Sequence, residues 1–284
     1  MRDNIYAVVI CYNPDIGNLL ENIKSISGQV SKIVIIDNNS TNYSEYASQV
    51  EGLYKVELIK LYKNKGIAEA LNIGLNYCSG KCQWFVSLDQ DSCADSNMVK
   101  NLLMISDEND GIIAPLIIDR NSVAVNGVDY THLTSLTAIT SGCLNNVDIL
   151  SKVGGFDSRL FIDFVDHEVC LRLTKFGYPI KHSKDAILYH SVGNITTHRV
   201  LGKRIITTNH APFRRYFLFR NRILVYKRYI SQFPKWCLKG FVFMFRDIFV
   251  IMIFENKRMQ NIKYILKGIY HGITNNYDNS IIKN

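Results

Sequence analysis

The N-terminal part of the chain alternates short, almost continuously apolar runs with segments of helical periodicity. Runs that are apolar throughout are typical of strands covered on both faces, as in parallel sheets. Between them, apolar residues recur at intervals of three and four over residues 19–26 and 67–75. This alternation predicts an α/β fold with a mainly parallel central sheet, in which ligands bind where the strands end. The expected strands are residues 5–10, 32–36, 56–61, 83–88 and 111–117.

The rest of the chain adds helices and a basic C-terminal region. After an irregular stretch to residue 135, residues 165–176 predict a helix that ends at Gly177. Residues 209–229 are helical, basic and aromatic, and residues 236–254 are the most apolar part of the chain. With 284 residues and 47% hydrophobic content, the chain can bury a sizeable core. We therefore expect a catalytic domain over residues 1–208 and a basic, amphipathic helical extension over residues 209–284.

Charge and cysteine content limit the environment of the protein. The net charge of +8 is concentrated in a run of cations from Arg199 to Arg228 that contains no Asp or Glu, and such a run favours phosphates, nucleic acid or an acidic lipid surface. The seven cysteines lack the paired spacing of a zinc site, which predicts reduced, mostly buried thiols. The first ten residues contain no long apolar segment after a basic one. We therefore expect no secretory signal peptide and a cytoplasmic protein.

Two carboxylates, Asp89 and Asp91, directly follow the expected strand 83–88. At the end of a strand, carboxylates two residues apart can hold a hard divalent cation, Mg²⁺ or Mn²⁺, and the ribose of a nucleotide. The cation would neutralise a diphosphate leaving group. The alternative is an acidic turn that caps the next helix.

The ends of the first and second strands carry further polar groups. Asp37 begins an Asp-Asn-Asn-Ser turn and can accept the imide N–H of uracil or thymine. The alternative is an ordinary turn in which Ser40 or Thr41 caps the next helix. Tyr12 and Asn13 follow the first strand and add an aromatic ring and an amide at the same edge of the sheet.

Small residues open the helix after the third strand. Asn64 and Gly66 allow the backbone to approach a diphosphate near a helix N-terminus. A tight helix packing contact explains the glycines of this segment, Gly66 and Gly74, equally well. His190 follows another expected strand, and a lone histidine is more often a packed or surface residue than a ligand.

The order of these motifs resembles the family 2 glycosyltransferases with the GT-A fold. The resemblance covers residues 5–222 in consistent order. It continues past the sheet in Thr140-Ser141-Gly142, Gly154-Gly155-Phe156-Asp157 and residues 160–168, which resemble the bacterial rhamnosyltransferase branch in particular. The resemblance implies a Rossmann-like catalytic domain followed by a C-terminal helical, membrane-associating extension.

The resemblance also implies roles for individual residues. Asp37 would hold the base, Asp89 the ribose region and Asp91 the metal that bridges both phosphates, with His190 as a third metal or phosphate contact. Asp166 would be the general base, which the reaction needs because a sugar hydroxyl loses its proton as it attacks the anomeric carbon. One carboxylate suffices for a single displacement with inversion.

Two neighbouring carboxylates are alternatives for this base. On a helix, Asp163 and Asp166 lie three residues apart and would share a face, whereas Glu168 sits four residues before Arg172 and suits a structural ion pair. Family members usually carry Glu-Asp where this chain has Val165 and Asp166, so the first acidic position is missing here.

The C-terminal region offers a phosphate site and a membrane site. Arg214, Arg215 and Arg220 resemble the helix that follows the catalytic domain in this family, and arginine forks suit the diphosphate of the donor or of a lipid-linked acceptor. The alternative is a solvated basic face. Residues 240–254 are too short and too interrupted to span a bilayer, but flanked by Lys and Arg they suit a helix in the membrane interface. Intramolecular packing or a dimer contact is the alternative.

These observations predict a metal-dependent, inverting glycosyltransferase on the inner face of the cell membrane. We expect it to transfer L-rhamnose from dTDP-L-rhamnose to a lipid-linked oligosaccharide in the synthesis of an O-antigen or capsule type polysaccharide. A UDP-hexose-dependent transferase of the same family is the first alternative, since Asp37 and Tyr12 do not separate thymine from uracil.

Two alternatives belong to other classes of protein. Residues 214–229 interleave basic and aromatic side chains, as nucleic-acid-binding proteins do. However, the chain contains no recognised nucleic-acid motif, and Asp89 and Asp91 would repel phosphates without a metal, so we expect no nucleic acid partner. A degenerate transferase kept as an assembly partner would bind nucleotide without turnover, and Val165 is the only residue that supports it.

Overall fold

A computed structural model describes residues 4–119, 136–190, 196–200, 203–279 and 281. The expected irregular stretch up to residue 135 lies outside these residues from position 120 onward. The chain divides into two compact units, which are described separately below. The first unit consists of residues 1–158 and 165–191, and the second of residues 159–164 and 192–284. The expected extension from residue 209 onward lies within the second unit.

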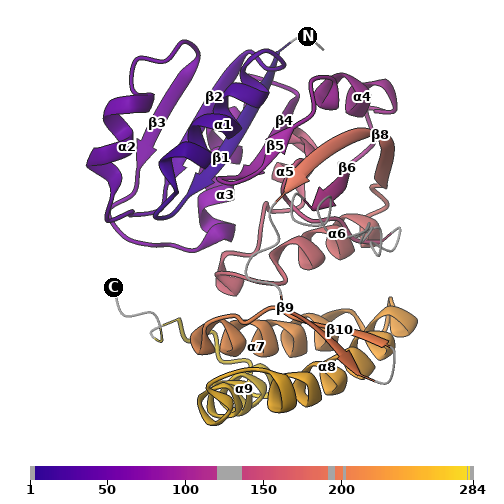
Figure 1. The fold of residues 1–284 in the computed structure, drawn as a ribbon. Coiled ribbons are helices and arrows are strands. Elements are labelled where there is room, and N and C mark those ends of the chain that lie inside the picture. Colours follow the sequence, from indigo (N-terminus) through magenta and orange to yellow (C-terminus); the bar gives the residue numbers. More distant parts are fainter. Residues whose placement is uncertain (1–3, 120–135, 191–195, 201–202, 280, 282–284) are drawn as a thin grey trace. The chain divides into compact units, whose positions relative to one another are not determined.

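The first unit is built on one sheet, whose described strands follow the order β3-β2-β1-β4-β7-β6-β8-β5 (Figure 1). The first four strands of this order are parallel to one another, which confirms the prediction of a mainly parallel sheet. They are β3 (Val56–Lys60), β2 (Lys32–Asp37), β1 (Ile5–Cys11) and β4 (Trp84–Asp89). All four were expected from their apolar runs.

The other half of the sheet contains antiparallel pairs. β7 (Leu144–Asn146) runs antiparallel to both of its neighbours, β4 and β6 (Ile112–Asp119). β8 (Ile180–His190) is parallel to β6, and the two-residue strand β5 (Cys93–Ala94) pairs antiparallel with β8. β5 and β7 are too short to carry a recognisable apolar pattern, and neither was predicted.

Helices cover both faces of this sheet. Successive residues of a strand point to opposite faces, so Val8 and Val9 of β1 mark the two sides. Val9 belongs to one buried cluster with Leu19 of α1, whereas Gly74 of α3 lies directly against Val8. This double cover explains why the parallel strands are apolar throughout. The helices of the first unit are α1 (Ile16–Ser27), α2 (Tyr43–Val50), α3 (Ile67–Cys78), α4 (Met98–Met104), α5 (Val147–Lys152) and α6 (Val165–Lys175), and the 3₁₀ turn η1 (Ser158–Leu160) lies at the boundary between the units.

Local signals set the ends of several helices. Asp15 caps α1, because its side chain accepts a hydrogen bond from the Asn18 N–H at 2.9 Å. Asn146 caps α5 in the same way through the Ile149 N–H at 3.1 Å. Gly177 ends α6 as predicted, with a φ of +82° that favours glycine.

The seven cysteines are all unpaired thiols, and six of them are buried, which confirms the prediction. Burial raises the pKa of Cys170 to about 12, so this thiol stays protonated at neutral pH. These cysteines behave as small apolar core residues.

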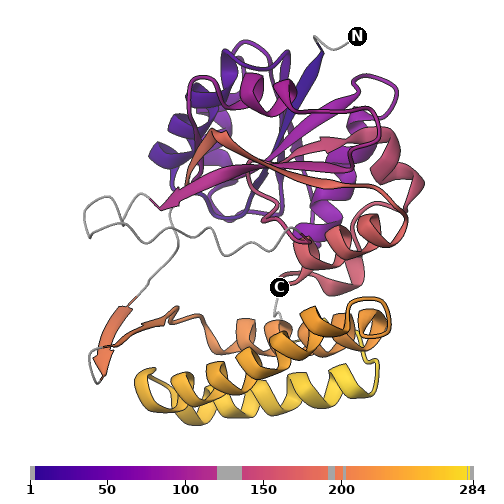
Figure 2. The same cartoon turned by 90° about the vertical axis from the view of Figure 1, so that its right-hand side faces the viewer.

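The described part of the second unit is formed by helices and a β-hairpin (Figure 2). Within it, α7 (Pro212–Tyr229) and α9 (Arg258–Ile273) approach closely: a Cβ on Gly268 would lie 2.5 Å from the Tyr216 carbonyl oxygen. α8 (Pro234–Phe254) completes the core of the unit through Met244 and Ile251. No helix in the described part of the chain is long and apolar enough to cross a membrane. The hairpin, β9 (Thr196–Val200) with β10 (Lys203–Thr207), and helix α9 were not predicted.

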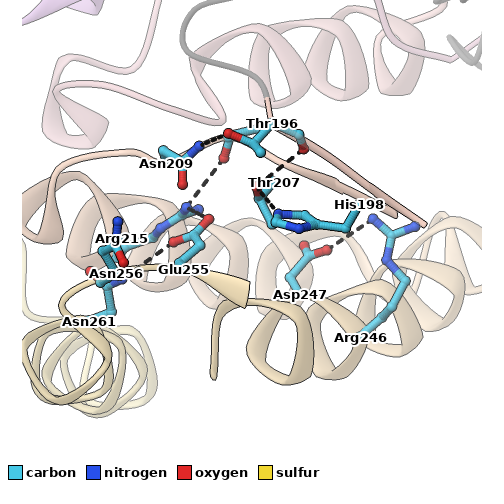
Figure 3. A network of polar contacts seen from close by, with 11 residues as sticks. Thr196, His198, Thr207, Asn209, Arg215, Arg246, Asp247, Glu255, Asn256 and Asn261 are labelled. Carbon is cyan, nitrogen blue, oxygen red and sulfur yellow. Dashed lines mark hydrogen bonds and ion pairs between the residues drawn. The ribbon is translucent and has the colours of Figure 1, made fainter. Parts of the chain in front are cut away.

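A polar network ties the hairpin and the end of α8 to α7 (Figure 3). Asn209 donates to the Thr196 hydroxyl at 2.8 Å, and the Thr207 hydroxyl donates to the Thr196 carbonyl at 3.3 Å. The central contact is the buried ion pair of Arg215 with Glu255, at 2.5 Å. Removing one partner of such a pair would leave an uncompensated buried charge.

The close packing of α3 on β1 predicts the effect of a single methyl group. A Cβ on Gly74 would lie 2.4 Å from Val8 Cγ1. Because Val8 is fully buried and stiff, we expect Gly74→Ala to lower the free energy of unfolding by about 1–3 kcal/mol in urea denaturation. Gly28→Ala is the control, since that Cβ would meet nothing within 4 Å, and it should change stability by less than about 1 kcal/mol. Equal stability of the two variants would contradict the packing described here.

Candidate functional site

The carboxyl ends of three neighbouring strands meet at one edge of the sheet. In the register of the sheet, Cys11 pairs with Asp37 and Ile10 pairs with Asp89. The loops after β1, β2 and β4 therefore leave the sheet side by side. This arrangement brings together Tyr12, Asn13, Asp37 and Asp89, as the sequence predicted.

Asp37 is the last residue of β2 and is fully buried. Its carboxylate accepts a hydrogen bond from the Tyr46 hydroxyl at 2.6 Å and from the Ser40 N–H at 3.1 and 3.2 Å. Burial, and then the hydrogen bond to Asp37, raise the pKa of Tyr46, so its phenol remains a donor. Tyr46 was not predicted as a partner of Asp37, because this contact between α2 and the end of β2 exists only in the fold.

Side chains cross-link the loops around Asp37. Asn13, with a φ of +48°, donates its N–H to the Ser40 hydroxyl at 2.8 Å, and its side-chain oxygen accepts from the Thr41 N–H at 2.7 Å. Gln90, between the two aspartates, accepts a hydrogen bond from the Tyr12 N–H at 2.8 Å. The amide of Asn13 is thus used to fix the loops, and the ring of Tyr12 is left 47% exposed.

The segment before α3 joins the same edge. Asn38 accepts a hydrogen bond from the Lys65 N–H at 2.8 Å, and Asn64 accepts one from the Gly66 N–H at 3.0 Å. Gly66 has a φ of +82°, a conformation that side chains rarely adopt. The two glycines therefore differ: Gly66 shapes the loop beside β2, and Gly74 is explained by helix packing.

Asp89, Asp91 and His190 form a candidate metal centre. Each offers one ligand atom, and these atoms all lie within 4.8 Å of one another. The pairing of Cys93 with Tyr189 in β5 and β8 brings His190 beside the second aspartate, whose Oδ1 lies 3.6 Å from His190 Nδ1. Ligands about 2.0–2.2 Å from a cation lie about 3–4.3 Å apart, so this set of donors fits Mg²⁺ or Mn²⁺ after a small adjustment.

Two buried serines support this centre. The Ser92 hydroxyl lies 2.8 Å from His190 Nδ1 and 2.8 Å from the Ser141 hydroxyl. Ser141 in turn accepts a hydrogen bond from the Asp89 N–H at 3.0 Å. Since both serines are buried, this chain of hydrogen bonds fixes the imidazole ring relative to the aspartates. The motif Thr140-Ser141-Gly142 indicated part of this arrangement, but nothing in the sequence indicated Ser92.

Asp166 is the second residue of α6, and its carboxylate accepts a hydrogen bond from the His167 N–H at 2.8 Å. Burial raises the pKa of the Cys143 thiol, and the charges of Cys170, Asp166 and Asp89 raise it further.

The other two candidate bases have different roles. Asp163 precedes α6, has a φ of +64° and pairs with Arg214 at 3.0 Å within the second unit. The prediction that it shares a helix face with Asp166 was wrong, because α6 begins only at Val165. Glu168 is buried and pairs with Arg172 at 2.7 Å, which confirms the expected structural ion pair.

Arg215 and Arg220 are both held by partners within the second unit. Arg215 is held by Glu255 (Figure 3), and Arg220 is fully buried and donates to the carbonyl oxygens of Arg159, Leu160 and Asp278. Both expectations, a diphosphate site and a solvated basic face, are corrected by this burial. An arginine is buried where acceptors surround it, and these acceptors are far away in the sequence.

Comparison with known proteins decides the family. The model of the family described as Glycosyl transferase family 2 matches residues 6–166, which include the strand ends, Asp89, Asp91 and Asp166. The chain belongs to this family. It is therefore a glycosyltransferase, as predicted.

Individual relatives agree with this assignment. The chain is 33% identical to the dTDP-rhamnosyl transferase RfbF of Shigella flexneri over 246 residues, which cover 80% of this chain and 81% of RfbF. This similarity confirms the rhamnosyltransferase branch of the family.

Solved structures show the same fold. S. aureus TarS 1-349 in complex with UDP-GlcNAc has a TM-score of 0.63 at 13% identity, over 98% of this chain and 89% of TarS 1-349. GalNAc-T7 with UDP, GalNAc and Mn²⁺ has a TM-score of 0.62 at 12% identity, over 95% of this chain. The chain spans only 56% of the length of GalNAc-T7. These structures confirm the GT-A fold.

The serine chain predicts a measurable effect on metal affinity. We expect Ser92→Ala to weaken Mn²⁺ binding about tenfold or more, because His190 loses the group that orients its ring. Titration with Mn²⁺ in the presence of dTDP, followed by electron paramagnetic resonance, measures this affinity. Ser87→Ala is the matched control: Ser87 is equally buried, but its hydroxyl donates to the Thr140 carbonyl, so Mn²⁺ affinity should stay the same. Equal affinities of both variants would show that the chain does not orient the histidine.

Proposed function

We propose that this enzyme transfers L-rhamnose from dTDP-L-rhamnose to a hydroxyl of a lipid-linked glycan, with inversion at the anomeric carbon. The product would extend a bacterial surface polysaccharide. The observation that carries the choice of donor is the 33% identity to the dTDP-rhamnosyl transferase RfbF over 80% of the chain. The polar edge of the sheet supplies groups suited to each part of such a donor.

Asp91 and His190 would hold Mg²⁺ or Mn²⁺, and Asp89 would bind the ribose region. When bound, the cation would neutralise the negative charge that develops on the diphosphate leaving group. Asn64 and Gly66 precede the N-terminus of α3, where backbone N–H groups favour a phosphate. These groups orient the donor so that its anomeric carbon faces the acceptor.

The base would stack on the exposed ring of Tyr12. Since Asp37 is fully buried, we infer that it acts on the base mainly by holding the loop from Asn38 to Ser40, with Tyr46 as its partner. Asn13 fixes this loop from the other side. The site would therefore recognise a pyrimidine through a rigid loop.

Asp166 would accept the proton of the acceptor hydroxyl. The bond that forms joins this oxygen to the anomeric carbon, and the bond that breaks joins that carbon to the diphosphate. Glu168 is unsuited to this role, because it is buried and paired with Arg172. The assignment of Asp166 does not need an acidic residue at Val165.

Calorimetric titration tests the donor. We expect dTDP-rhamnose to bind in the presence of Mn²⁺, and to bind at least about tenfold more weakly with a chelator, because the diphosphate would lose its counter-charge. UDP-glucose, UDP-galactose and GDP-mannose should bind more weakly than dTDP-rhamnose. Preference for a UDP-sugar would keep the mechanism but contradict the proposed donor.

Two variants serve as controls for this titration. Asp91→Ala should abolish the Mn²⁺-dependent part of binding, whereas Asp166→Ala should bind the donor normally and transfer no sugar. If both variants lost binding and transfer equally, the proposed division of roles would be wrong.

We further propose that the second unit holds the enzyme on the cytoplasmic face of the cell membrane. One face of α8 packs in the core of the unit, through Cys237, Met244 and Ile251. Away from this core the helix exposes an apolar stripe with spacings of four, three, four and three residues, and Lys235, Lys239 and Arg246 are exposed on the same helix. Such a surface suits the interface of an anionic membrane, where a lipid-linked acceptor lies. The stripe consists of Leu238, Val242, Phe245, Phe249 and Met252.

Charges in this stripe should release the protein from lipid. We expect the double variant Phe245→Glu, Phe249→Glu to reduce sedimentation with phosphatidylglycerol vesicles at least about tenfold, because two exposed rings can no longer enter the interface. Phe176→Glu, in the first unit, is the control, since Phe176 is also exposed and should not contribute. Unchanged sedimentation of the double variant would refute the membrane assignment.

A further inference from the structure

The segment 159–164 directly precedes α6 and has an unusual backbone. Phe161, Asp163 and Phe164 each have a φ of +64°. Bulky residues rarely adopt this left-handed conformation. They keep it only where their surroundings impose it, and such positions concentrate at functional sites. The residues that impose this backbone are therefore candidates for a role in the reaction.

Asn221 of α7 holds the backbone of the segment. This residue is fully buried, and its side-chain amide donates to three carbonyl oxygens: Leu160 at 2.7 Å, Ile162 at 2.8 Å and Asp163 at 2.9 Å. One NH₂ group with two hydrogens thus lies within hydrogen-bond distance of three carbonyl oxygens, so that one of its hydrogens is shared. Few other arrangements of this segment would satisfy all of these groups.

Arg220 fixes the orientation of that amide. Its Nε donates to the Asn221 side-chain oxygen at 2.9 Å, so the NH₂ group of Asn221 must face the segment. The guanidinium also donates to the carbonyls of Arg159 at 3.1 Å and Leu160 at 3.2 Å. Because Arg220 is fully buried, these hydrogen bonds are shielded from water.

Side chains of the segment are also held by α7. Phe161 stacks on Phe217 with ring centroids 5.3 Å apart, and Phe164 meets the ring of Tyr226 edge-on at 5.9 Å. Asp163 forms its ion pair with Arg214. Every residue from 159 to 164 therefore has a backbone or side-chain contact with α7.

We propose that Arg220 and Asn221 are positioning residues for the general base. Asp166 follows Phe164 by two residues, so the backbone that Asn221 holds leads directly into the first turn of α6, which carries this carboxylate. This inference rests on the proposed function, in which Asp166 takes the proton of the acceptor. It gives Arg220 and Asn221 a role that is separate from the proposed membrane binding.

The test combines hydrogen exchange with donor turnover. We expect Asn221→Ala to speed amide exchange in residues 160–166 at least about tenfold, and to slow the release of dTDP from dTDP-rhamnose with Mn²⁺ by about tenfold or more. In this assay water replaces the acceptor, and its proton goes to Asp166. The affinity for dTDP should change less than about twofold, since the nucleotide groups lie at the strand ends. Arg220→Lys should act in the same direction and more weakly, because it keeps the charge but loses the bond to Asn221.

Asn261→Ala is the matched control. Asn261 is a buried amide in the same unit, but it donates to Glu255 and to the Asn256 carbonyl, not to the segment. It should lower stability and leave both exchange in 160–166 and kcat unchanged. The inference is overturned if Asn221→Ala leaves that exchange unchanged, if it slows turnover no more than Asn261→Ala, or if it abolishes dTDP binding as well.

Hydrogen exchange is measured without dTDP-rhamnose, so its result depends on the contacts of α7 with this segment and not on the proposed reaction. A failure of this inference can therefore be told apart from a failure of the proposed function. Asp166→Asn gives the second separation, because it should remove turnover without altering exchange in residues 160–166. If Asp166→Asn released dTDP at the normal rate, the base assignment would be wrong and Arg220 and Asn221 could not act through it.

Discussion

The parallel pairing of β1 with both β2 and β4 is the constraint on which the active site depends. This register sets Cys11 beside Asp37 and Ile10 beside Asp89, so three loops leave the sheet at one edge. A slip of one residue would turn each strand over and bury its polar end groups against helices. The loops are then fixed to one another by side chains, through Asn13 to Ser40 and through Gln90 to Tyr12. The side chains of the candidate site are thus placed by the sheet and oriented by hydrogen bonds between loops.

The sequence predicted those features that depend on local pattern. The four parallel strands, α6 with its end at Gly177, and the carboxylates Asp89 and Asp91 follow from apolar runs and from motifs with fixed spacing. Tyr46 and Ser92 could not be predicted, because their roles depend on partners brought close only by the fold. Asp163 was placed wrongly for a related reason: helical spacing was assumed where left-handed residues, held by the distant Asn221, break the helix.

The arginines show why net charge does not describe a surface. In the run from Arg199 to Arg228, Arg215 and Arg220 are buried, and Arg222 pairs with Asp247 at 2.9 Å. Burying a cation is unfavourable unless carboxylates or carbonyls surround it. These arginines therefore contribute to the interior of the fold and not to a positively charged surface. The cations exposed along α8 are a better guide to an anionic surface, because they accompany apolar side chains that are exposed as well.

The backbone conformation of residues 159–164 is unfavourable by itself and is stabilised by hydrogen bonds from residues far away in the sequence. Three left-handed residues cost about 1–3 kcal/mol each, or about 3–9 kcal/mol together. Five hydrogen bonds from Arg220 and Asn221 to the carbonyls of the segment offset this cost, and the ion pair of Asp163 with Arg214 and the ring contacts of Phe161 and Phe164 add to them. Two buried polar residues of α7 are thus used to hold one backbone shape. We propose that this shape serves the start of α6, where Asp166 lies.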